Sequence, residues 1–331
     1  MFSQIKFKYK ISIWLFTVLV IGNSATVSNG SVKVPEKCPG LYCGRITLDT
    51  GQFSECGACP RGYQPDDVSV CRRCDTNPTF YDWMFLGFMA ILSLVLHWFF
   101  IDFTNKIKGS LIVLHISALI ESVLAAIFTV LLVDPMAEFN IRSCPVKQLS
   151  DWYSMLYNPS PNYTDTIHCT REIVYPLYTI SMVYYAFSLV LMMLIRPFLS
   201  YKFLDKKGTN SIYAALYFHP ILIVLQAVFG GLLYYAFPYI VIVLSIVTNA
   251  THLASSPDQN VRKLFKWTFC DARNLTIIIG HWFLHAFGII AMTQLADPYI
   301  HIPLLALVPF PTIFYILTVQ FTHPDHIETV S

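Results

Sequence analysis

The sequence predicts an all-α membrane protein, with seven transmembrane helices and a small N-terminal disulfide-rich lumenal head. Three observations carry this prediction: few charges, long apolar segments and a cluster of cysteines. Charged residues make up 13% of the 331 residues and hydrophobic residues 55%, whereas soluble globular proteins carry about 25% charge. A water-soluble enzyme is therefore disfavoured. The net charge of +2 gives no basic surface for nucleic acid, so the expected partner of most of the chain is the lipid bilayer.

A membrane-spanning helix needs about 20 mostly apolar residues. The stretch from Ile212 to Leu253 has no charge and is too long for one crossing, so we expect two helices separated at Gly230-Gly231, where glycine permits a turn. The last span is interrupted by prolines. These are tolerated in a membrane helix when neighbouring helices satisfy the freed backbone carbonyls. The predicted bundle, 83–321, has its spans at 83–101, 111–133, 173–195, 212–229, 232–253, 275–296 and 300–321.

Basic residues predict the orientation, because cytosolic loops retain Lys and Arg. Alternate loops hold Lys106, Lys108, Arg196, Lys202, Lys206, Lys207, Arg262, Lys263, Lys266 and Arg273. The opposite loops hold only Arg142, Lys147 and Arg171. This alternation requires 212–253 to cross twice. It predicts a lumenal or extracellular N-terminus and a cytosolic tail, 322–331.

Residues 1–25 are typical of a signal peptide. Lys6, Lys8 and Lys10 precede an apolar segment, Ile11 to Gly22, which is too short to span a membrane. An uncleaved anchor is the alternative. Either segment sends the following residues into the lumen.

The predicted head, 26–82, is defined by its cysteines: Cys38, Cys43, Cys56, Cys59, Cys71 and Cys74. Two Cys-x2-Cys pairs match a zinc ribbon, but an oxidising lumen and an even number of thiols favour three disulfides. The segment has too few large apolar residues for a core, so cross-links must stabilise it. We expect a further bridge between Cys144 and Cys169 in the lumenal loop, with Cys270 left over as an inert thiol.

Glycosylation sequons follow the same topology. Asn29 and Asn162 lie on the lumenal side and are expected to carry glycans. Asn249 and Asn274 fall at or inside the cytosolic ends of spans and are expected to be bare.

Several ionisable residues fall at membrane depth, where such groups are costly: His97, His115, Glu121, His219, His281 and His285. His281 and His285 share one helix face. They could ligate zinc, with Glu121 activating water, as in seven-helix ceramidase-like hydrolases. We favour the interpretation that these histidines form hydrogen bonds between helices. We therefore expect no catalytic residue, metal or cofactor. A seven-helix receptor is a further alternative, but the number of helices alone is not evidence for receptor function.

Several strings resemble the Jun-kinase-associated membrane protein family over about Cys38 to Phe321. They include Cys38-Pro-Gly-Leu-Tyr-Cys43-Gly-Arg45, Leu149-Ser-Asp-Trp-Tyr153 and Gly230-Gly-Leu-Leu-Tyr-Tyr-Ala-Phe-Pro-Tyr239. The resemblance implies a non-enzymatic endoplasmic reticulum adaptor of the unfolded-protein response. Its implied partners are the proteasome, ubiquitin ligases of ER-associated degradation and Jun N-terminal kinase, with the plasma membrane as a second location. The signal-like segment departs from the family pattern.

The cytosolic face offers two kinase-docking candidates, Arg262-Lys263-Leu264-Phe265 and Lys206-Lys207. Neither has the full pattern of basic residues before spaced apolar ones. The favoured alternative is that these residues anchor the loops near lipid headgroups.

Overall fold

The computed structural model describes residues 37–104, 112–157, 169, 171–203 and 208–322. The predicted signal segment 1–25, Asn29, Asn162, Lys206-Lys207 and the tail beyond Thr322 lie outside the described residues.

The head contains two small antiparallel sheets. Strand β1 (Cys43–Gly44) pairs with β2 (Gly57–Ala58), and β3 (Tyr63–Pro65) pairs with β4 (Cys71–Arg73). Disulfides join Cys38 to Cys56 and Cys59 to Cys71. A side chain at Gly44 would lie 2.7 Å from both sulfurs of the second bridge. Cystines and a glycine thus occupy the centre that apolar side chains fill in larger domains.

The rest of the chain is helical. Its long helices are α1 (Phe80–Thr104), α2 (Ile112–Leu132), α3 (Leu177–Phe203), α4 (Thr209–Ala254) and α6 (Ala272–Thr293). Shorter elements are the 3₁₀ segments η1 (Leu149–Tyr157) and η2 (Leu305–Leu307), and the helices α5 (Val261–Cys270), α7 (Pro298–Leu304) and α8 (Phe310–Thr322). In the described residues, six helical stretches are long and apolar enough to cross a membrane, the last combining α7, η2 and most of α8. The predicted class, a helical membrane protein with a disulfide-rich N-terminal region, is confirmed.

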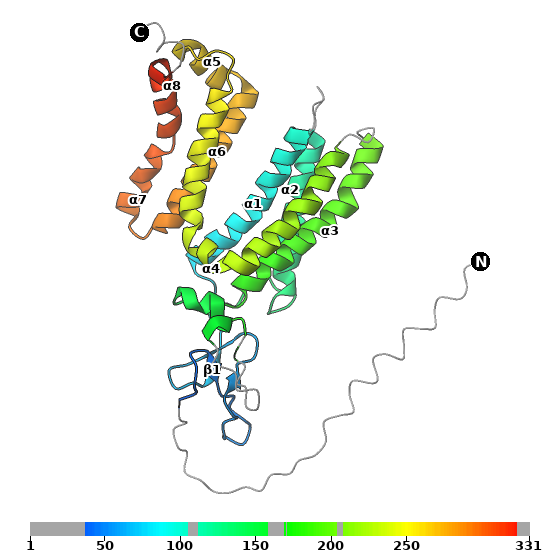
Figure 1. Cartoon of the computed structure of the whole chain (residues 1–331), viewed down its shortest axis with the longest axis vertical. Helices are drawn as coiled ribbons and strands as arrows, with labels where there is room; N and C mark the ends of the chain where they lie inside the picture. Colours follow the sequence, from blue (N-terminus) through cyan, green and yellow to red (C-terminus); the bar gives the residue numbers. More distant parts are fainter. Residues whose placement is uncertain (1–36, 105–111, 158–168, 170, 204–207, 323–331) are drawn as a thin grey trace, which may run out of the picture. The chain divides into compact units, whose positions relative to one another are not determined.

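Helix α4 accounts for the difference between six helices and seven predicted spans. It runs for 46 residues, or about 70 Å at 1.5 Å per residue, more than twice the ~30 Å hydrocarbon core. Figure 1 shows it bent sharply near its middle into two arms. Gly230 and Gly231, where we expected the two spans to separate, stay helical. The two expected spans are therefore represented by two arms of a single bent helix (Figure 1).

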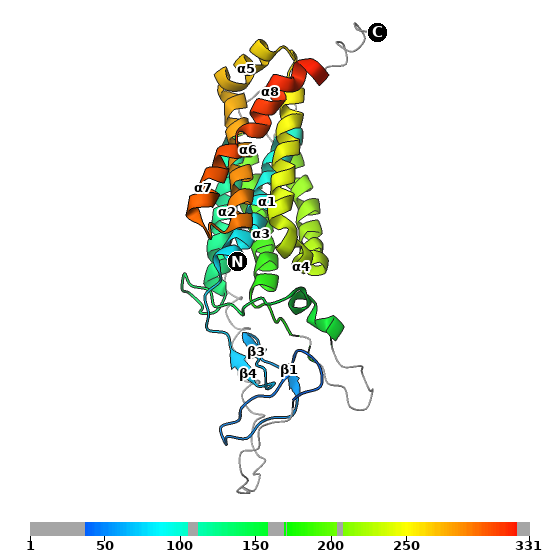
Figure 2. The ribbon, with the colours of Figure 1, turned by 90° about the vertical axis from the view of Figure 1, so that its left-hand side faces the viewer.

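The helices pack as two groups. The larger core joins α1, α2, α3 and the first arm of α4, and it reaches Phe237, Val241 and Ala291 of the second arm and α6. The smaller core joins the second arm to α5, α6 and α8 through Leu253, Leu264, Ile278, Ile316 and Val319. Figure 2 shows the strands and α5 beyond opposite ends of the long helices. We call these ends the head side and the far side.

Candidate functional site

Two disulfides tie the head to the loop between α2 and α3. They join Cys43 to Cys169 and Cys74 to Cys144. The expected bridge between Cys144 and Cys169 is therefore wrong, as is the closure of three disulfides within the head. The backbone reinforces the link, because the Ser143 N–H of the loop donates to the Thr76 carbonyl at 2.8 Å. Within the loop, the Cys144 N–H donates to the Tyr175 carbonyl at 2.7 Å. Head and loop form one cross-linked unit.

Tyr42 of the head reaches η1 directly. Its hydroxyl lies 2.7 Å from Ser150 Oγ and donates to Asp151 Oδ1 at 2.9 Å. The other Asp151 oxygen accepts the N–H groups of Lys147 and Gln148 at 2.8 and 3.0 Å, which begins the turn of η1. Burial, opposed by the Ser150 hydrogen bond and assisted by Asp151, raises the pKa of Tyr42 to about 12. The phenol therefore stays neutral and bonded over the physiological range.

The segment η1 in turn packs on the middle of α4. A side chain at Gly231 would lie 2.7 Å from Trp152 Cβ and 2.9 Å from a ring carbon of Tyr153. The Trp152 ring also lies 5.1 Å from that of Tyr234 and 5.7 Å from that of Phe85. The glycine pair is thus needed for close approach of η1 rather than for breaking the helix.

Three tyrosine hydroxyls contact backbone groups where α4 bends. Tyr178 donates to the Ala227 carbonyl at 2.9 Å, and Tyr81 donates to the Tyr234 carbonyl at 2.7 Å. The Leu232 N–H points to the Tyr153 hydroxyl at 3.4 Å. Proline lacks an N–H, so Pro238 leaves the Tyr234 carbonyl without its helical partner, and Tyr81 replaces that partner. The bend is held by side chains of α1, η1 and α3.

A buried carboxylate completes this contact. Asp82, in the first turn of α1, accepts the Tyr234 hydroxyl at 2.6 Å and the Thr79 N–H at 2.7 Å. It is 4% exposed. Disulfides, Tyr42, η1, Trp152 and the bend of α4 therefore form a continuous set of contacts, which we call the head-side junction.

A second polar cluster lies between α1, α2, α3 and α4. Glu121 and Arg196 are fully buried and form an ion pair. The Arg196 Nη2 lies 2.8 Å from Glu121 Oε2, and the Arg196 Nε donates to Oε2 at 2.9 Å and to Oε1 at 3.2 Å. The Ser117 hydroxyl donates to Glu121 Oε1 at 2.6 Å. Arg196 was predicted to lie in a cytosolic loop, and the structure corrects this: it lies within α3 and neutralises a carboxylate. Glu121 is thereby engaged in the pair, rather than free to activate a water.

Two histidines adjoin this pair. The His219 Nε2 lies 3.1 Å from Ser188 Oγ and 3.3 Å from Ser93 Oγ, and its Nδ1 lies 2.9 Å from the Ala215 carbonyl. The His97 ring lies 5.0 Å from that of His219. Within the described part of the chain neither nitrogen of His97 has a hydrogen-bond partner. His97 is 1% exposed, so it lies inside the bundle, but among these residues it does not make the expected hydrogen bond between helices.

His281 and His285 do not form a metal centre with other described residues. The His281 Nδ1 lies 3.3 Å from the Thr248 hydroxyl across to α4, and His285 is buried in the packing of α6. No three His, Cys, Asp or Glu side chains in the described segments are grouped as metal ligands. The zinc-ribbon alternative also fails, because Cys56, Cys59, Cys71 and Cys74 are all in disulfides.

The far side presents α5. Asn260 caps it, accepting the Arg262 N–H at 3.1 Å. Leu264 is fully buried, whereas Phe265 is 55% exposed beside the exposed Arg262, Lys263 and Lys266. The exposed Lys263 ammonium contacts Asp258 at 2.6 Å and lowers the pKa of that carboxyl. Of the two apolar residues in the predicted docking segment, only Phe265 is therefore accessible to a partner, and Leu264 is not.

Sequence reasoning did not identify Tyr42, Asp151 or Trp152 as a functional contact. Their strings were used only to recognise a family. The available signal was an aromatic, Asp-containing segment, Leu149-Ser-Asp-Trp-Tyr153, inside an otherwise polar loop. Such a segment has little reason to be apolar unless it packs on the bundle.

Residues 38–324 match the family of JNK1/MAPK8-associated membrane proteins. A human protein named JNK1/MAPK8-associated membrane protein is 51% identical over 306 residues, covering 90% of this chain and 97% of its own. A homologue from Caenorhabditis elegans is 30% identical over 320 residues, covering 91% and 98%. No solved structure matches the chain.

Proposed function

Because the chain belongs to the JNK1/MAPK8-associated membrane protein family, we propose that it is a non-enzymatic adaptor of the endoplasmic reticulum membrane. The head side faces the lumen, and the far side and C-terminus face the cytosol. The protein associates with Jun N-terminal kinase and brings proteasomes and ubiquitin ligases to the membrane during the response to misfolded proteins. The names of the relatives support the kinase, and the family resemblance supports the other partners.

The observation that carries this proposal is that the disulfides and the exposed basic residues of α5 lie at opposite ends of the long helices (Figure 2). Four disulfides need an oxidising compartment, and they lie on one side of the helices, while α5 with its three exposed basic residues lies on the other. This division supports a lumenal head and a cytosolic binding face. Contacts running through Tyr42, Trp152 and α4 connect the two.

The proposed mechanism is scaffolding. Individually weak contacts on short cytosolic loops gain effective concentration when several partners are held at one membrane surface. The side chains that suggested chemistry are used for packing: Glu121 pairs with Arg196, and His219 contacts two serines. Scaffolding needs no catalytic site, so it is consistent with the structural roles of both Glu121 and His219.

For the kinase, α5 is the contact surface that we propose. Phe265 is exposed between basic residues, an arrangement that suits an acidic and apolar docking groove. The ring of Phe269 lies 4.8 Å from that of Phe265 and extends the apolar surface. Leu264 cannot contribute without unpacking from Leu253 and Ile278.

The test is co-purification from mild-detergent extracts of cells expressing the full chain. Jun N-terminal kinase and proteasome subunits are quantified by immunoblot for wild type, Phe265→Ala with Lys266→Glu, and the control Phe103→Ala, which also removes an exposed phenylalanine near the far side. We expect the α5 variant to lose the kinase and the control to keep it. Kinase bound equally by all three would reject α5 as the contact, and absence of both partners from wild type would reject the adaptor.

Orientation has a separate test. Asn249 donates to Thr312 at 2.8 Å and Asn274 donates to the Trp267 carbonyl at 3.2 Å, and both are buried. We expect endoglycosidase-sensitive glycans at Asn29 and Asn162 and none at these two. A glycan at Asn249 or Asn274 would contradict the proposed topology.

A further inference from the structure

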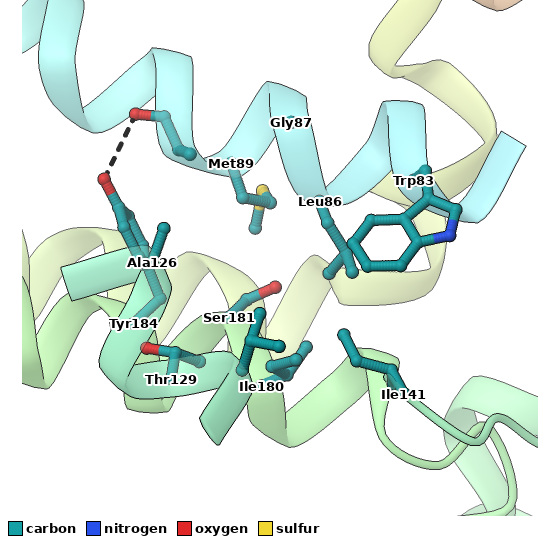
Figure 3. A pocket seen from close by; sticks show the side chains of 12 residues that line it. Trp83, Leu86, Gly87, Met89, Ala126, Thr129, Ile141, Ile180, Ser181 and Tyr184 are labelled. Atoms are coloured by element: carbon teal, nitrogen blue, oxygen red, sulfur yellow. Dashed lines mark hydrogen bonds between the residues drawn. The ribbon is translucent and has the colours of Figure 1, made fainter. Parts of the chain in front are cut away.

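A cavity of about 230 Å³ lies between the head-side halves of α1, α2 and α3. Figure 3 shows side chains from the three helices and from Ile141 pointing toward it. It is lined by Trp83, Leu86, Gly87, Met89, Ala90, Ala126, Thr129, Val130, Ile141, Ile180, Ser181 and Tyr184. It is larger than the roughly 150 Å³ apolar cavity that takes up a benzene molecule, so it has room for a hydrocarbon group.

The cavity has a closed floor and a mouth. Every lining residue of α3 is buried, so this helix forms the floor. The partly exposed lining residues belong to α1 and α2, and Ala90 and Ala126 of these two helices have small side chains that leave the space between them unfilled. Trp83 is 46% exposed at the start of α1. The mouth therefore opens between α1 and α2, on the lipid-facing surface.

The polar atoms around the cavity already have partners. Tyr184 and Ser122 share a hydrogen bond of 2.6 Å, and Thr129 donates to the Ala125 carbonyl at 2.7 Å. The Ser181 hydroxyl lies 3.5 Å from the Leu177 carbonyl. No buried side-chain atom of the lining lacks a partner in the described part of the chain. An occupant is thus offered dispersion contacts and no unmet hydrogen bond, which suits a hydrocarbon chain rather than a polar ligand.

We propose that this cavity binds one acyl chain of a bilayer phospholipid, with the headgroup at the head-side interface beside Trp83. A tryptophan at a helix end is typical of the level of lipid headgroups. A phospholipid can place one chain between α1 and α2 while its other chain stays in the bilayer. A free fatty acid or a sterol would bring its own carboxylate or hydroxyl, for which the lining has no unpaired partner.

This site lies apart from the kinase surface and does not depend on the proposed adaptor role. Ile141, which closes the cavity toward the head, is 1% exposed and stands three residues before the disulfide-bonded Cys144. The bound chain therefore packs against the loop that anchors the head, and it acts as part of the head-side packing.

The experiment uses the full chain in vesicles of phosphatidylcholine that carries a photoactivatable diazirine on one acyl chain. After irradiation, labelled peptides are mapped by mass spectrometry. Two variants fill the cavity from opposite walls, Ala126→Phe and Ala90→Phe. The control is Val123→Phe, which adds the same ring to α2 at a 50% exposed position. Thermal melting and intact disulfides show that each variant is folded.

We expect labels at 83–90, 126–130 and 180–184 in wild type and in Val123→Phe, and a loss of about tenfold in the two filled variants, as for a competitor that displaces a weakly held ligand. Parallel vesicles carry a diazirine fatty acid or a diazirine sterol. Labelling that is unchanged on filling, or that spreads evenly over all lipid-facing helices, overturns the proposal. Labelling of these peptides by the fatty acid or the sterol but not by phosphatidylcholine overturns the choice of a phospholipid.

Discussion

Among single residues, the Glu121–Arg196 pair makes the largest demand on the fold, because both groups are fully buried. Removing one partner of such a pair costs about 3–5 kcal/mol, since the other charge is left unpaired, whereas replacing both with apolar residues is often neutral. We therefore expect Arg196→Leu to lower the melting temperature strongly. Glu121→Leu combined with Arg196→Leu is expected to recover most of the loss, as measured by thermal unfolding in detergent micelles.

The outcome is informative in either direction. Equal destabilisation by the single and double changes would mean that the pair has a role beyond charge compensation. It would direct attention to the adjacent His97, whose ring nitrogens have no partner among the described residues.

Tyr42 gives a prediction about pH. Its hydroxyl has an ordinary pKa near 10, which burial raises to about 12. The neutral phenol is favoured in the folded state, so its contribution to stability is fully present below pH 10 and is lost as pH rises toward 12. Hydrogen exchange of η1 in a Cys270→Ser background should therefore accelerate over that interval. In the Tyr42→Phe variant, hydrogen exchange of η1 should already be fast at neutral pH and should not accelerate further between pH 10 and 12. The same acceleration in the variant would show that another group causes it.

At the residue scale, the sequence was sufficient to predict that most cysteines form disulfides, but not to pair them. Pairing depends on which loop folds back onto which strand. Cys43 and Cys169 are 126 residues apart, and nothing local records that contact. Arg196 shows the same limit: it was counted as a loop anchor because the composition around it is basic, and only the neighbouring helix reveals its partner.

Among the elements, α4 is the one whose geometry depends most on its neighbours. Pro238 leaves the Tyr234 carbonyl without a helical donor, and Tyr81 supplies one at 2.7 Å. Tyr81→Phe should cost about 1–3 kcal/mol, the penalty for an unpaired buried carbonyl. In a Pro238→Ala background the residue at 238 regains its N–H, so the same change should cost little. A double-mutant cycle of melting temperatures measures this coupling, and additive effects would refute the role of Tyr81.

Gly231 provides a matched test of the contact with η1. A methyl group there would lie 2.7 Å from Trp152 Cβ, whereas one at Gly280 of α6 meets nothing within 4 Å. Gly231→Ala should destabilise by about 1–3 kcal/mol through overpacking. Gly280→Ala should be neutral or stabilising by up to about 1 kcal/mol, because alanine favours a helix. If Gly231→Ala and Gly280→Ala changed the unfolding temperature equally, Trp152 would be able to move aside at little energetic cost.

The helices themselves were largely predictable because membrane depth imposes a length and a composition. Helix ends differ by a few residues, as α1 begins at Phe80 rather than at 83. The middle of α4 was the exception. The sequence has glycines where a turn was needed, but whether the chain breaks or bends is decided by Tyr81, Tyr153 and Tyr178, which come from other elements.

At the scale of the whole molecule, the head-side junction predicts that the head controls the spacing of the two helix groups on the far side. The two groups meet along α4, and η1 is held against its bend by two long-range disulfides. The disulfide between Cys43 and Cys169 fixes the loop that carries η1, whereas that between Cys59 and Cys71 closes only 12 residues inside the head. Removing the first should therefore loosen η1, which then keeps only the Cys74–Cys144 bridge, and removing the second should not.

Spin labels report this spacing directly. In the Cys270→Ser background, nitroxides are attached through Tyr213→Cys and Val247→Cys, exposed positions toward the far-side ends of the two arms of α4. Pulsed electron resonance should give one narrow distance distribution, which broadens in Cys43→Ala with Cys169→Ala and stays narrow in Cys59→Ala with Cys71→Ala. If the junction constrains the spacing, the two double variants must differ in this way. Of these two disulfides, only the one between Cys43 and Cys169 restrains the segment that packs on Gly231. If both pairs broadened the distribution equally, head stability alone would matter; if neither did, α4 would hold its bend without η1, and the head would exert no control over the far side.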